Sequence, residues 1–344
     1  MVIVLIVVFL CRNKRYGAAD KPPLCQLSNH WSCKGIQHNP STSLVRCSNS
    51  KKYSRSIALS DFCYDYNQMS AHTHFGYSQE YESIQKIGKK ISSSVAVQPE
   101  NVVKNRYSNI LPYDRTRVKL TYIQGEAGSD YINANYIPGF KSPREFISCQ
   151  GPLPGTIADM WRMVWELNIT NVVMVTKLVE RGKVRCEQYW PEDHKPVFFG
   201  DVIVTMTTKT ETEKNWHVRE FMIQYSAKTR KVKHFHFLDW PDHGVPETSS
   251  PLVNFVKTVR LHILNENTPT LVHCSAGVGR TGTFICLDRL LQHIEKYDHV
   301  DIMGIVCEMR LHRAYMVQTE VIFCLIYLPE TLVFYESIFT RLPI

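Results

Sequence analysis

The stretch that decides the fold reads His273-Cys274-Ser275-Ala276-Gly277-Val278-Gly279-Arg280-Thr281-Gly282. It follows an apolar run at 270–273 that is typical of a buried strand. It precedes a segment from residue 281 that carries apolar side chains on one helical face. We call the segment between them, Cys274–Arg280, the cysteine loop. Its glycines, Gly277 and Gly279, let the backbone curl so that successive N–H groups face one point. The sequence therefore predicts a strand, an anion-binding loop and a helix.

The cysteine loop combines a nucleophile with groups that bind a phosphoryl group. The loop amides and the positive end of the following helix attract an anion, and with Arg280 they are expected to hold Cys274 as a thiolate. The planar fork of Arg280 can bind two phosphoryl oxygens. Attack by the thiolate would form a phosphocysteine, and Thr281 is placed to offer its hydroxyl to the departing sulfur. A single cysteine is more often a buried structural thiol, but the spacing of these three residues favours a phosphate site.

Strand-like and helical patterns alternate along the chain. Strands are expected at 172–176, 202–205 and 233–237, and helices at 79–84, 153–166 and 249–263. This alternation predicts an α/β domain. The sequence contains no internal repeat, so we expect no second tandem copy.

Two further segments carry polar residues suited to a phosphorylated substrate. One reads Trp240-Pro241-Asp242-His243-Gly244-Val245-Pro246, and the other reads Lys104-Asn105-Arg106-Tyr107-Ser108-Asn109-Ile110-Leu111-Pro112-Tyr113-Asp114. Taken alone, the first is an ordinary turn and the second a loop with a buried tyrosine. Together with the cysteine loop, and in this order, they resemble the classical protein tyrosine phosphatases.

The resemblance implies a central twisted mixed β-sheet flanked by helices, and a role for each matching residue. Asp242 is implied to be the general acid and then the base that activates water. Tyr107 is implied to wall a deep slot for an aromatic ring, and Asn109 to contact the substrate main chain. Gln318 is implied to position the hydrolytic water. The residues implied to bind the phosphoryl group are Ser275, Ala276, Gly277, Val278 and Gly279. Those implied to support the site are Glu180, as partner of Arg280, Arg185, as neighbour of Asp242, and His273 and Trp240.

The resemblance covers residues 78–320, is strongest to single-domain receptor-type members, and stops soon after Gln318. Ile322 stands where the family continues with a second glutamine. The run Val321–Leu328 is almost wholly apolar without an amphipathic stripe, and Pro329 would break a helix there. We therefore expect 321–344 to be a divergent apolar tail in which the helix that braces Gln318 is missing or altered.

The N-terminal region differs in charge from the rest of the chain. Residues 1–77 carry nine Lys/Arg and three acids, so most of the formal net charge of +8 lies there, and a nucleic-acid-binding domain is not supported. The apolar segment 1–11 is too short to span a bilayer and lacks the cleavage site of a signal peptide. A buried strand or helix stays an alternative. The favoured interpretation is the cytoplasmic end of a membrane-spanning helix, followed by a disordered basic juxtamembrane linker at 12–77 and a catalytic domain at 78–320. This predicts a single-pass membrane protein with a cytoplasmic catalytic domain, or a cytoplasmic protein if 1–11 does not span.

The eleven cysteines form no CxxC pair, and those at 25, 33, 47 and 63 are too irregularly spaced for a zinc site. A reduced, cytosolic domain is the simplest interpretation. We expect neither a metal nor another cofactor, because the thiolate, the backbone amides and Arg280 already supply the nucleophile and the charge stabilisation.

Three functions are compatible with these patterns. The first is hydrolysis of phosphotyrosine in tyrosine-phosphorylated proteins. The second is a phosphotyrosine-binding pseudophosphatase, in which the altered C-terminus leaves Gln318 unsupported. The third is an inositol-lipid phosphatase, which is less favoured because Ser275–Gly279 contains no lysine and because Asp242 and Tyr107 favour a deep, aryl-selective slot.

Overall fold

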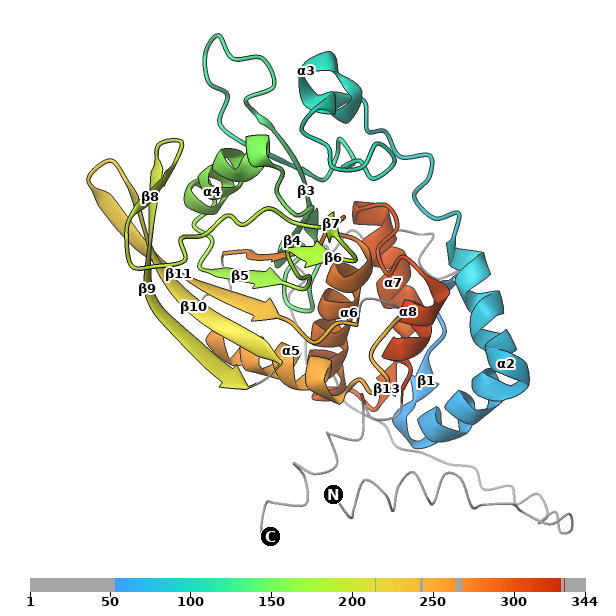
Figure 1. Ribbon diagram of the computed structural model, residues 1–344. Helices are drawn as coiled ribbons and strands as arrows, with labels where there is room; N and C mark the ends of the chain where they lie inside the picture. The colour runs from blue at the N-terminus through green and yellow to red at the C-terminus, as the bar shows by residue number, and fades with distance from the viewer. Residues whose placement is uncertain (1–52, 214, 242–243, 264–267, 329–330, 332–344) are drawn as a thin grey trace, which may run out of the picture. The chain divides into compact units, whose positions relative to one another are not determined.

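The cysteine loop leaves the centre of a nine-stranded mixed sheet in the computed structural model of the chain (Figure 1). The structure describes residues 53–213, 215–241, 244–263, 268–328 and 331, all within one compact unit. The strand order is β2-β3-β4-β12-β5-β11-β10-β9-β8. Four neighbours run parallel: β4 (Phe146–Cys149), β12 (Thr270–His273), β5 (Asn171–Met174) and β11 (Lys228–Phe237). Every residue of β4, β12 and β5 is buried, as parallel strands covered on both faces require.

The outer strands pair antiparallel. At one edge lie β2 (Arg117–Lys119) and β3 (Tyr131–Ile137), and at the other lie β10 (Trp216–Tyr225), β9 (Val202–Glu213) and β8 (Val197–Phe199). Two small ribbons stand apart from this sheet. They are β6 (Val179–Glu180) with β7 (Lys183–Val184), and β1 (Ile57–Ala58) with β13 (His299–Val300).

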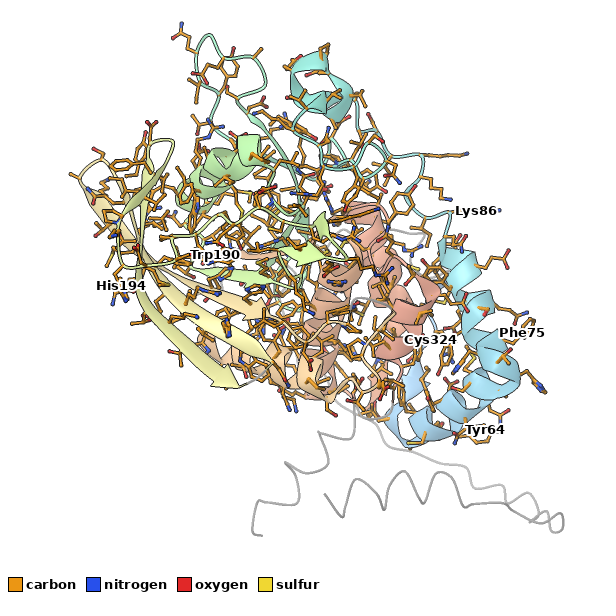
Figure 2. The ribbon with its side chains drawn as sticks, in the orientation of Figure 1. Tyr64, Phe75, Lys86, Trp190, His194 and Cys324 are labelled. Atoms are coloured by element: carbon orange, nitrogen blue, oxygen red, sulfur yellow. The ribbon has the colours of Figure 1, made fainter. Side chains whose placement is uncertain are left out.

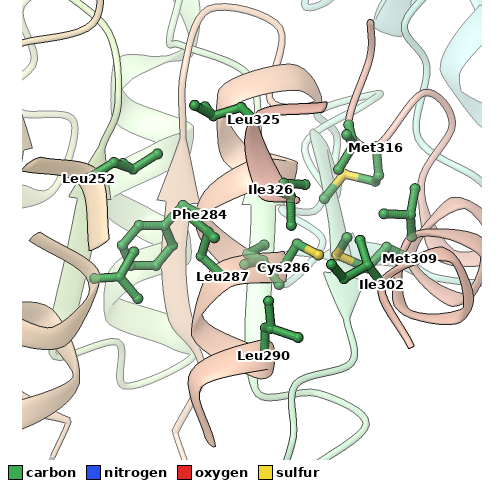
Figure 3. Packing of buried hydrophobic residues seen from close by; sticks show 14 of the residues in the cluster. Leu252, Phe284, Cys286, Leu287, Leu290, Ile302, Met309, Met316, Leu325 and Ile326 are labelled. Atoms are coloured by element: carbon green, nitrogen blue, oxygen red, sulfur yellow. The ribbon is translucent and has the colours of Figure 1, made fainter. Parts of the chain in front are cut away.

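Helices cover both faces of the sheet. On one face α4 (Ile157–Glu166) buries Met160, Trp161 and Met163 in a cluster with strand residues such as Val202. The second cluster joins the sheet to α5 (Ser250–His262), α6 (Gly279–Ile294), α7 (Ile302–His312) and α8 (Glu320–Ile326). Figure 3 shows this packing, with Phe284 and Leu287 of α6 between side chains of α5, α7 and α8. The remaining helices are α2 (Phe62–Ile84), α3 (Pro99–Val102) and the 3-10 turns η2 (Leu59–Asp61), η3 (Val95–Val97) and η4 (Pro154–Thr156).

The expected α/β architecture and the elements around the cysteine loop are confirmed. The strands predicted at 172–176, 202–205, 233–237 and 270–273 correspond to β5, β9, β11 and β12, and the helices predicted at 153–166, 249–263 and from 281 correspond to α4, α5 and α6. Strands β9 and β11 are longer than predicted. Their outer halves lie in a hairpin with β10 and carry exposed polar residues, so they lack the apolar run by which a strand is recognised.

The expectation of a disordered linker up to residue 77 is wrong for residues 53–77. Strand β1 pairs with β13, and α2 begins at Phe62, although residues 71–74 leave helical geometry within it. The linker lacks a helical pattern because α2 buries only a few side chains, among them Phe62 and Tyr77. Figure 2 shows Tyr64 and Phe75 on its exposed side, with 70% and 59% of their surface accessible. The predicted segment 1–11 and the linker up to residue 52 lie outside the described residues.

The sequence predicts that the bracing helix after residue 320 is missing or altered, and the first of these alternatives is wrong. Helix α8 forms over Glu320–Ile326 and is capped by Thr319, whose hydroxyl accepts from the N–H of Ile322 over 3.4 Å. Phe323, Leu325 and Ile326 are buried against α2 and α6. The run lacks an amphipathic stripe because neighbours cover α8 on several sides, and Pro329 follows its end.

Candidate active site

Donors of the scaffold hold three carbonyl groups of the cysteine loop. The N–H of Gly151 donates to the carbonyl of Ser275 over 2.9 Å. The guanidinium of Arg313 donates to the carbonyls of Ala276 and Gly277, each over 3.0 Å. The hydroxyl of Ser148 also donates to Gly277, over 2.6 Å. Because the C=O and N–H groups of a peptide point in opposite directions, these bonds turn loop amides away from the scaffold, which is the arrangement that an anion-binding loop needs.

The backbone of the cysteine loop passes so close to β4 that position 277 requires glycine. Gly277 has a φ of +71°, and a Cβ atom there would lie 2.1 Å from the carbonyl oxygen of Cys149. The loop ends where Gly279 opens α6, and the N–H groups of Gly282 and Val317 both donate to the carbonyl of Val278. The side chain of Cys274 borders the apolar cluster and is only 5% exposed.

Arg280 is held by a carboxylate. Both its terminal nitrogens donate to Glu180, one to each oxygen, and the second of these bonds is 3.1 Å long. Burial alone would raise the pKa of Glu180, but the hydrogen bonds and charge of Arg280 outweigh it and hold that pKa below its ordinary value. Arg185 approaches the same carboxylate, with 3.6 Å between its Nε and Glu180 Oε2. Trp240 contacts Arg280 as well, with 5.2 Å between the centroid of its ring and Arg280 Cζ.

Tyr107 lies at the rim of the cysteine loop. Its hydroxyl is 2.8 Å from the hydroxyl of Ser275. The neighbouring Arg106 fixes the segment, because its backbone N–H donates to Gln150 Oε1 over 2.9 Å and its guanidinium donates to the carbonyls of Gly151 and Pro152. Asn109 follows on the exposed surface. The structure thus brings the 104–114 segment to the same place as the cysteine loop.

Gln318 lies beside the first turn of α6. A Cβ atom added to Gly279 would be 3.5 Å from Oε1 of Gln318 and 3.4 Å from Cδ1 of Ile322, so both side chains flank the end of the cysteine loop. The hydroxyl of Tyr81 on α2 donates to the carbonyl of Gln318. Gln318 is therefore held by α2 through Tyr81, and it stands directly before Thr319, which caps α8.

Comparison with known proteins identifies the family to which this geometry belongs. Residues 101–329 match the family model described as protein-tyrosine phosphatase. The chain belongs to the protein-tyrosine phosphatase family. It is 45% identical to human "Phosphatidylinositol phosphatase PTPRQ" over 269 residues, which are 78% of this chain and 12% of that protein. It is 45% identical to mouse "Receptor-type tyrosine-protein phosphatase eta" over 273 residues, 78% of this chain and 22% of that one. With human "Receptor-type tyrosine-protein phosphatase H" it shares 44% identity over 268 residues, 77% and 24% of the two chains.

The chain thus spans less than a quarter of the length of each of these relatives. The match to the phosphatase family reaches residue 329 and so includes α8.

Asp242, the predicted general acid, lies outside the described residues. The segment before it is fixed, because Trp240 is 2% exposed and its indole N–H donates to the carbonyl of Gly244 over 3.3 Å. The predicted approach of Arg185 to Asp242 is likewise outside what the structure describes. Both roles stay predictions based on the phosphatase resemblance.

Thr281, the residue after Arg280, is fully buried in α6. Among the described residues, no group accepts a hydrogen bond from its Oγ1. A buried hydroxyl without a partner costs free energy unless an acceptor is supplied. The phosphatase resemblance implies that the sulfur of Cys274 becomes this acceptor during the reaction, and this role stays a prediction.

His273 belongs to a row of three hydrogen-bonded, buried side chains, His273, Tyr189 and His234, which joins the cysteine loop to β11. The hydroxyl of Tyr189 lies 2.6 Å from His273 Nε2 and 2.8 Å from His234 Nε2, and His273 Nδ1 lies 3.3 Å from the carbonyl oxygen of Cys274. Burial lowers the pKa of His273 to about 4 and that of His234 well below its ordinary value. Both imidazoles are therefore neutral at pH 7.

Sequence reasoning missed Arg313, Ser148 and Tyr189. Arg313 is fully buried and donates to Asn133 and Asn135, each over 2.8 Å, as well as to the cysteine loop. Burial lowers its pKa to about 10. No local pattern marks these residues, because they lie far from residue 274 in sequence and reach it only through the sheet. The signal that the sequence offers for Arg313 is a charged side chain in the largely apolar segment 302–317, where a buried arginine needs hydrogen-bond acceptors.

The described part of the chain contains no cluster of three or more His, Cys, Asp or Glu side chains arranged to hold a metal ion. Within the same residues, no helix combines the length and the apolar character needed to cross a bilayer.

Proposed function

We propose that the chain is a protein-tyrosine phosphatase that hydrolyses phosphotyrosine through a phosphocysteine. The observation that carries this proposal is the cysteine loop itself: its carbonyls are bound to the scaffold, its amides are turned the other way, and Arg280 closes the ring with its fork held by Glu180. Such a ring of donors suits a phosphoryl group whose charge is spread over three oxygens.

The reaction has two steps. The thiolate of Cys274 attacks phosphorus and the bond from phosphorus to the tyrosyl oxygen breaks, while Asp242 gives that oxygen a proton. In the second step Gln318 positions a water molecule, Asp242 takes a proton from it, and the phosphorus–sulfur bond breaks to release phosphate. The hydroxyl of Thr281 donates to the leaving sulfur. Arg280 and the loop amides bind the phosphoryl oxygens throughout.

The test is hydrolysis of a phosphotyrosine peptide by the purified chain. Cys274→Ser should abolish turnover, because the hydroxyl is a far weaker nucleophile, and Asp242→Ala should lower kcat by a factor of about 10²–10⁴. Cys307→Ser, a buried thiol of α7, is the matched control and should retain turnover. Turnover that survives Cys274→Ser would refute the phosphocysteine mechanism.

An inositol-lipid phosphatase is the second candidate, and the name of the relative "Phosphatidylinositol phosphatase PTPRQ" favours it. Tyr107 argues against it, because its hydroxyl is 2.8 Å from that of Ser275 and its aromatic ring at the rim of the cysteine loop suits stacking on a planar ring. Comparing kcat/KM for a phosphotyrosine peptide and a soluble phosphoinositide distinguishes the two. A pseudophosphatase receives less support than the sequence suggested, because α8 is present beside Gln318.

We also propose that the chain acts in the cytoplasm next to a membrane, on tyrosine-phosphorylated proteins. Support comes from the apolar segment 1–11, the basic residues after it, and the receptor-type relatives. Fractionation of cells that express the chain should recover it in the membrane pellet, and deletion of residues 1–11 should release it.

A further inference from the structure

A cavity lies at the β2 edge of the sheet and shares none of its lining residues with the cysteine loop or the 104–114 recognition segment other than Asp114. Its volume is about 620 Å³, within the range of small-molecule sites. It is lined by the chain from Asp114 to β2, by Tyr136 of β3, by the turn before β4 and by the end of α7. Its position beside an edge strand leaves it open to solvent-borne ligands.

Four cations line this cavity: Arg115, Arg117, Lys119 and Arg144. Three of them, all but Arg117, are exposed, and no described carboxylate lies within ion-pair distance of these three. Arg144 lies over the ring of Tyr136, with 4.8 Å from its Cζ to the ring centroid. This contact holds its charge at the cavity wall without neutralising it.

Arg117 is the buried member of the four. Its Nη2 donates to Asp130 over 2.6 Å and its Nη1 to the carbonyl of the same residue over 3.2 Å, which fixes the guanidinium. Its Nε is buried and has no acceptor among the described residues. Asp130 therefore balances the charge of Arg117 and fixes its guanidinium within the cavity lining, with one donor left unused.

Asp114 is the one carboxylate among the residues that line the cavity, and it is already engaged. It accepts hydrogen bonds from the hydroxyls of Ser92 and Ser94 and from the N–H groups of Ser94 and Val95. Burial alone would raise the pKa of Asp114, but these bonds outweigh it and lower the pKa to about 2. It stays charged but turns its oxygens to the 92–95 segment, so the cavity keeps an excess of positive charge.

We propose that this cavity binds an organic anion carrying two or more phosphate groups, such as an inositol phosphate. Among the described residues, Arg115, Lys119 and Arg144 have no carboxylate partner, whereas Arg117 is paired with Asp130. Three such cations favour a multiply charged partner, and the guanidinium forks match phosphate oxygens. The volume accommodates a phosphorylated ring. The ligand's source is either a soluble inositol phosphate or the headgroup of an anionic lipid, which present the same chemistry.

The test is isothermal titration calorimetry with inositol trisphosphate, done on the full chain carrying Arg280→Ala, which removes the main cation of the cysteine loop. Binding should persist in this background. Adding Lys119→Ala and Arg144→Ala should weaken it by about tenfold or more, because each lost charge-assisted hydrogen bond contributes strongly. Lys89→Ala with Lys90→Ala removes the same charge from two exposed positions elsewhere and should change binding by less than about twofold.

Sedimentation with phosphatidylcholine vesicles, with and without phosphatidylinositol bisphosphate, identifies the source. Binding to the soluble probe supports a free ligand. Binding only to the bisphosphate vesicles, reduced in the Lys119/Arg144 variant and retained in the Lys89/Lys90 variant, supports a lipid headgroup. The proposal is overturned if neither probe binds in the Arg280→Ala background, or if the two double variants weaken binding equally. Equal thermal unfolding temperatures for the double variants establish that both are folded.

Discussion

Glu180 determines how Arg280 presents its charge. A guanidinium bound through two nitrogens to one carboxylate has a single orientation, whereas a free arginine loses side-chain entropy when it binds a phosphoryl group. The cost of ordering Arg280 is therefore met during folding.

We expect Glu180→Gln to lower the phosphatase activity and to make the stability of the fold depend less on acid pH. The pKa of Glu180 lies below its ordinary value of 4.5, so its contribution to stability is complete above about that pH and is lost as pH falls through the folded pKa. The glutamine lacks this titration and forms a weaker bond, at a cost of about 1.5–3 kcal/mol at neutral pH. Urea midpoints at about pH 7 and about pH 4 measure the effect. The two proteins should differ more at the higher pH, and a constant difference would contradict the assignment.

Among the single residues of the site, only some could be predicted from the sequence. Residues within the cysteine loop are recognisable because loop, strand and helix are contiguous. Arg313 is not, because its contacts with Ala276 and Gly277 depend on how α7 returns beneath the loop. A buried arginine looks the same in sequence whether it supports a site or a distant ion pair.

Helix α8 shows why a short apolar element is hard to predict. Its sequence has no polar face because α2 and α6 both cover it, and the partner helix α2 lies more than 200 residues earlier. Tyr327, just after α8, makes several of the contacts with α2. Its ring lies 4.8 Å from that of Tyr77 and 5.2 Å from that of Phe323, and its hydroxyl donates to Glu80 over 3.0 Å.

We expect Tyr327→Ala to destabilise the protein by about 3–5 kcal/mol, because it leaves a cavity between α2 and α8. Since Gln318 is held by α2 and directly precedes the cap of α8, kcat should fall more than KM rises. Val321→Ala on the same helix is the control. Val321 is 55% exposed, so its truncation should change stability by less than about 0.5 kcal/mol. Thermal unfolding and steady-state kinetics on a phosphotyrosine peptide provide both readouts, and equal effects of the two variants would contradict this account of α8.

At the scale of the whole described unit, the N-terminal segment joins elements from the far end of the chain. Ile57 pairs with Val300, the backbone N–H of Arg55 donates to Asp301 over 3.1 Å, and the guanidinium of Arg55 pairs with Asp65 over 2.6 Å. The sequence predicted a domain that begins near residue 78, because 53–77 lacks periodicity. Its order arises from long-range contacts, which no window of neighbouring residues contains.

We expect a chain that begins at residue 78 to be less stable than one that begins at residue 53. It loses Ile57, Phe62 and Tyr77, and each buried apolar side chain contributes about 1.5–3 kcal/mol. The urea midpoint should fall, and the slope m should fall with the smaller surface exposed on unfolding. Tyr64→Ala in the longer chain removes an exposed aromatic and should leave the midpoint unchanged. Equal midpoints for the two chain lengths would mean that residues 53–77 contribute nothing to stability.

The buried row from β11 to the cysteine loop has a direction. The carbonyl of Cys274 can only accept, so His273 Nδ1 carries the proton of its neutral ring. Nε2 of His273 must then accept from the hydroxyl of Tyr189, and the oxygen of Tyr189 accepts from Nε2 of His234. Every proton in the row points toward the nucleophile's own peptide group, and each ring is fixed in one tautomer. Nitrogen chemical shifts of the two imidazoles should therefore differ in opposite senses. Tyr189→Phe should release the ring of His234 to exchange tautomers, whereas the carbonyl of Cys274 should keep the proton of His273 on Nδ1.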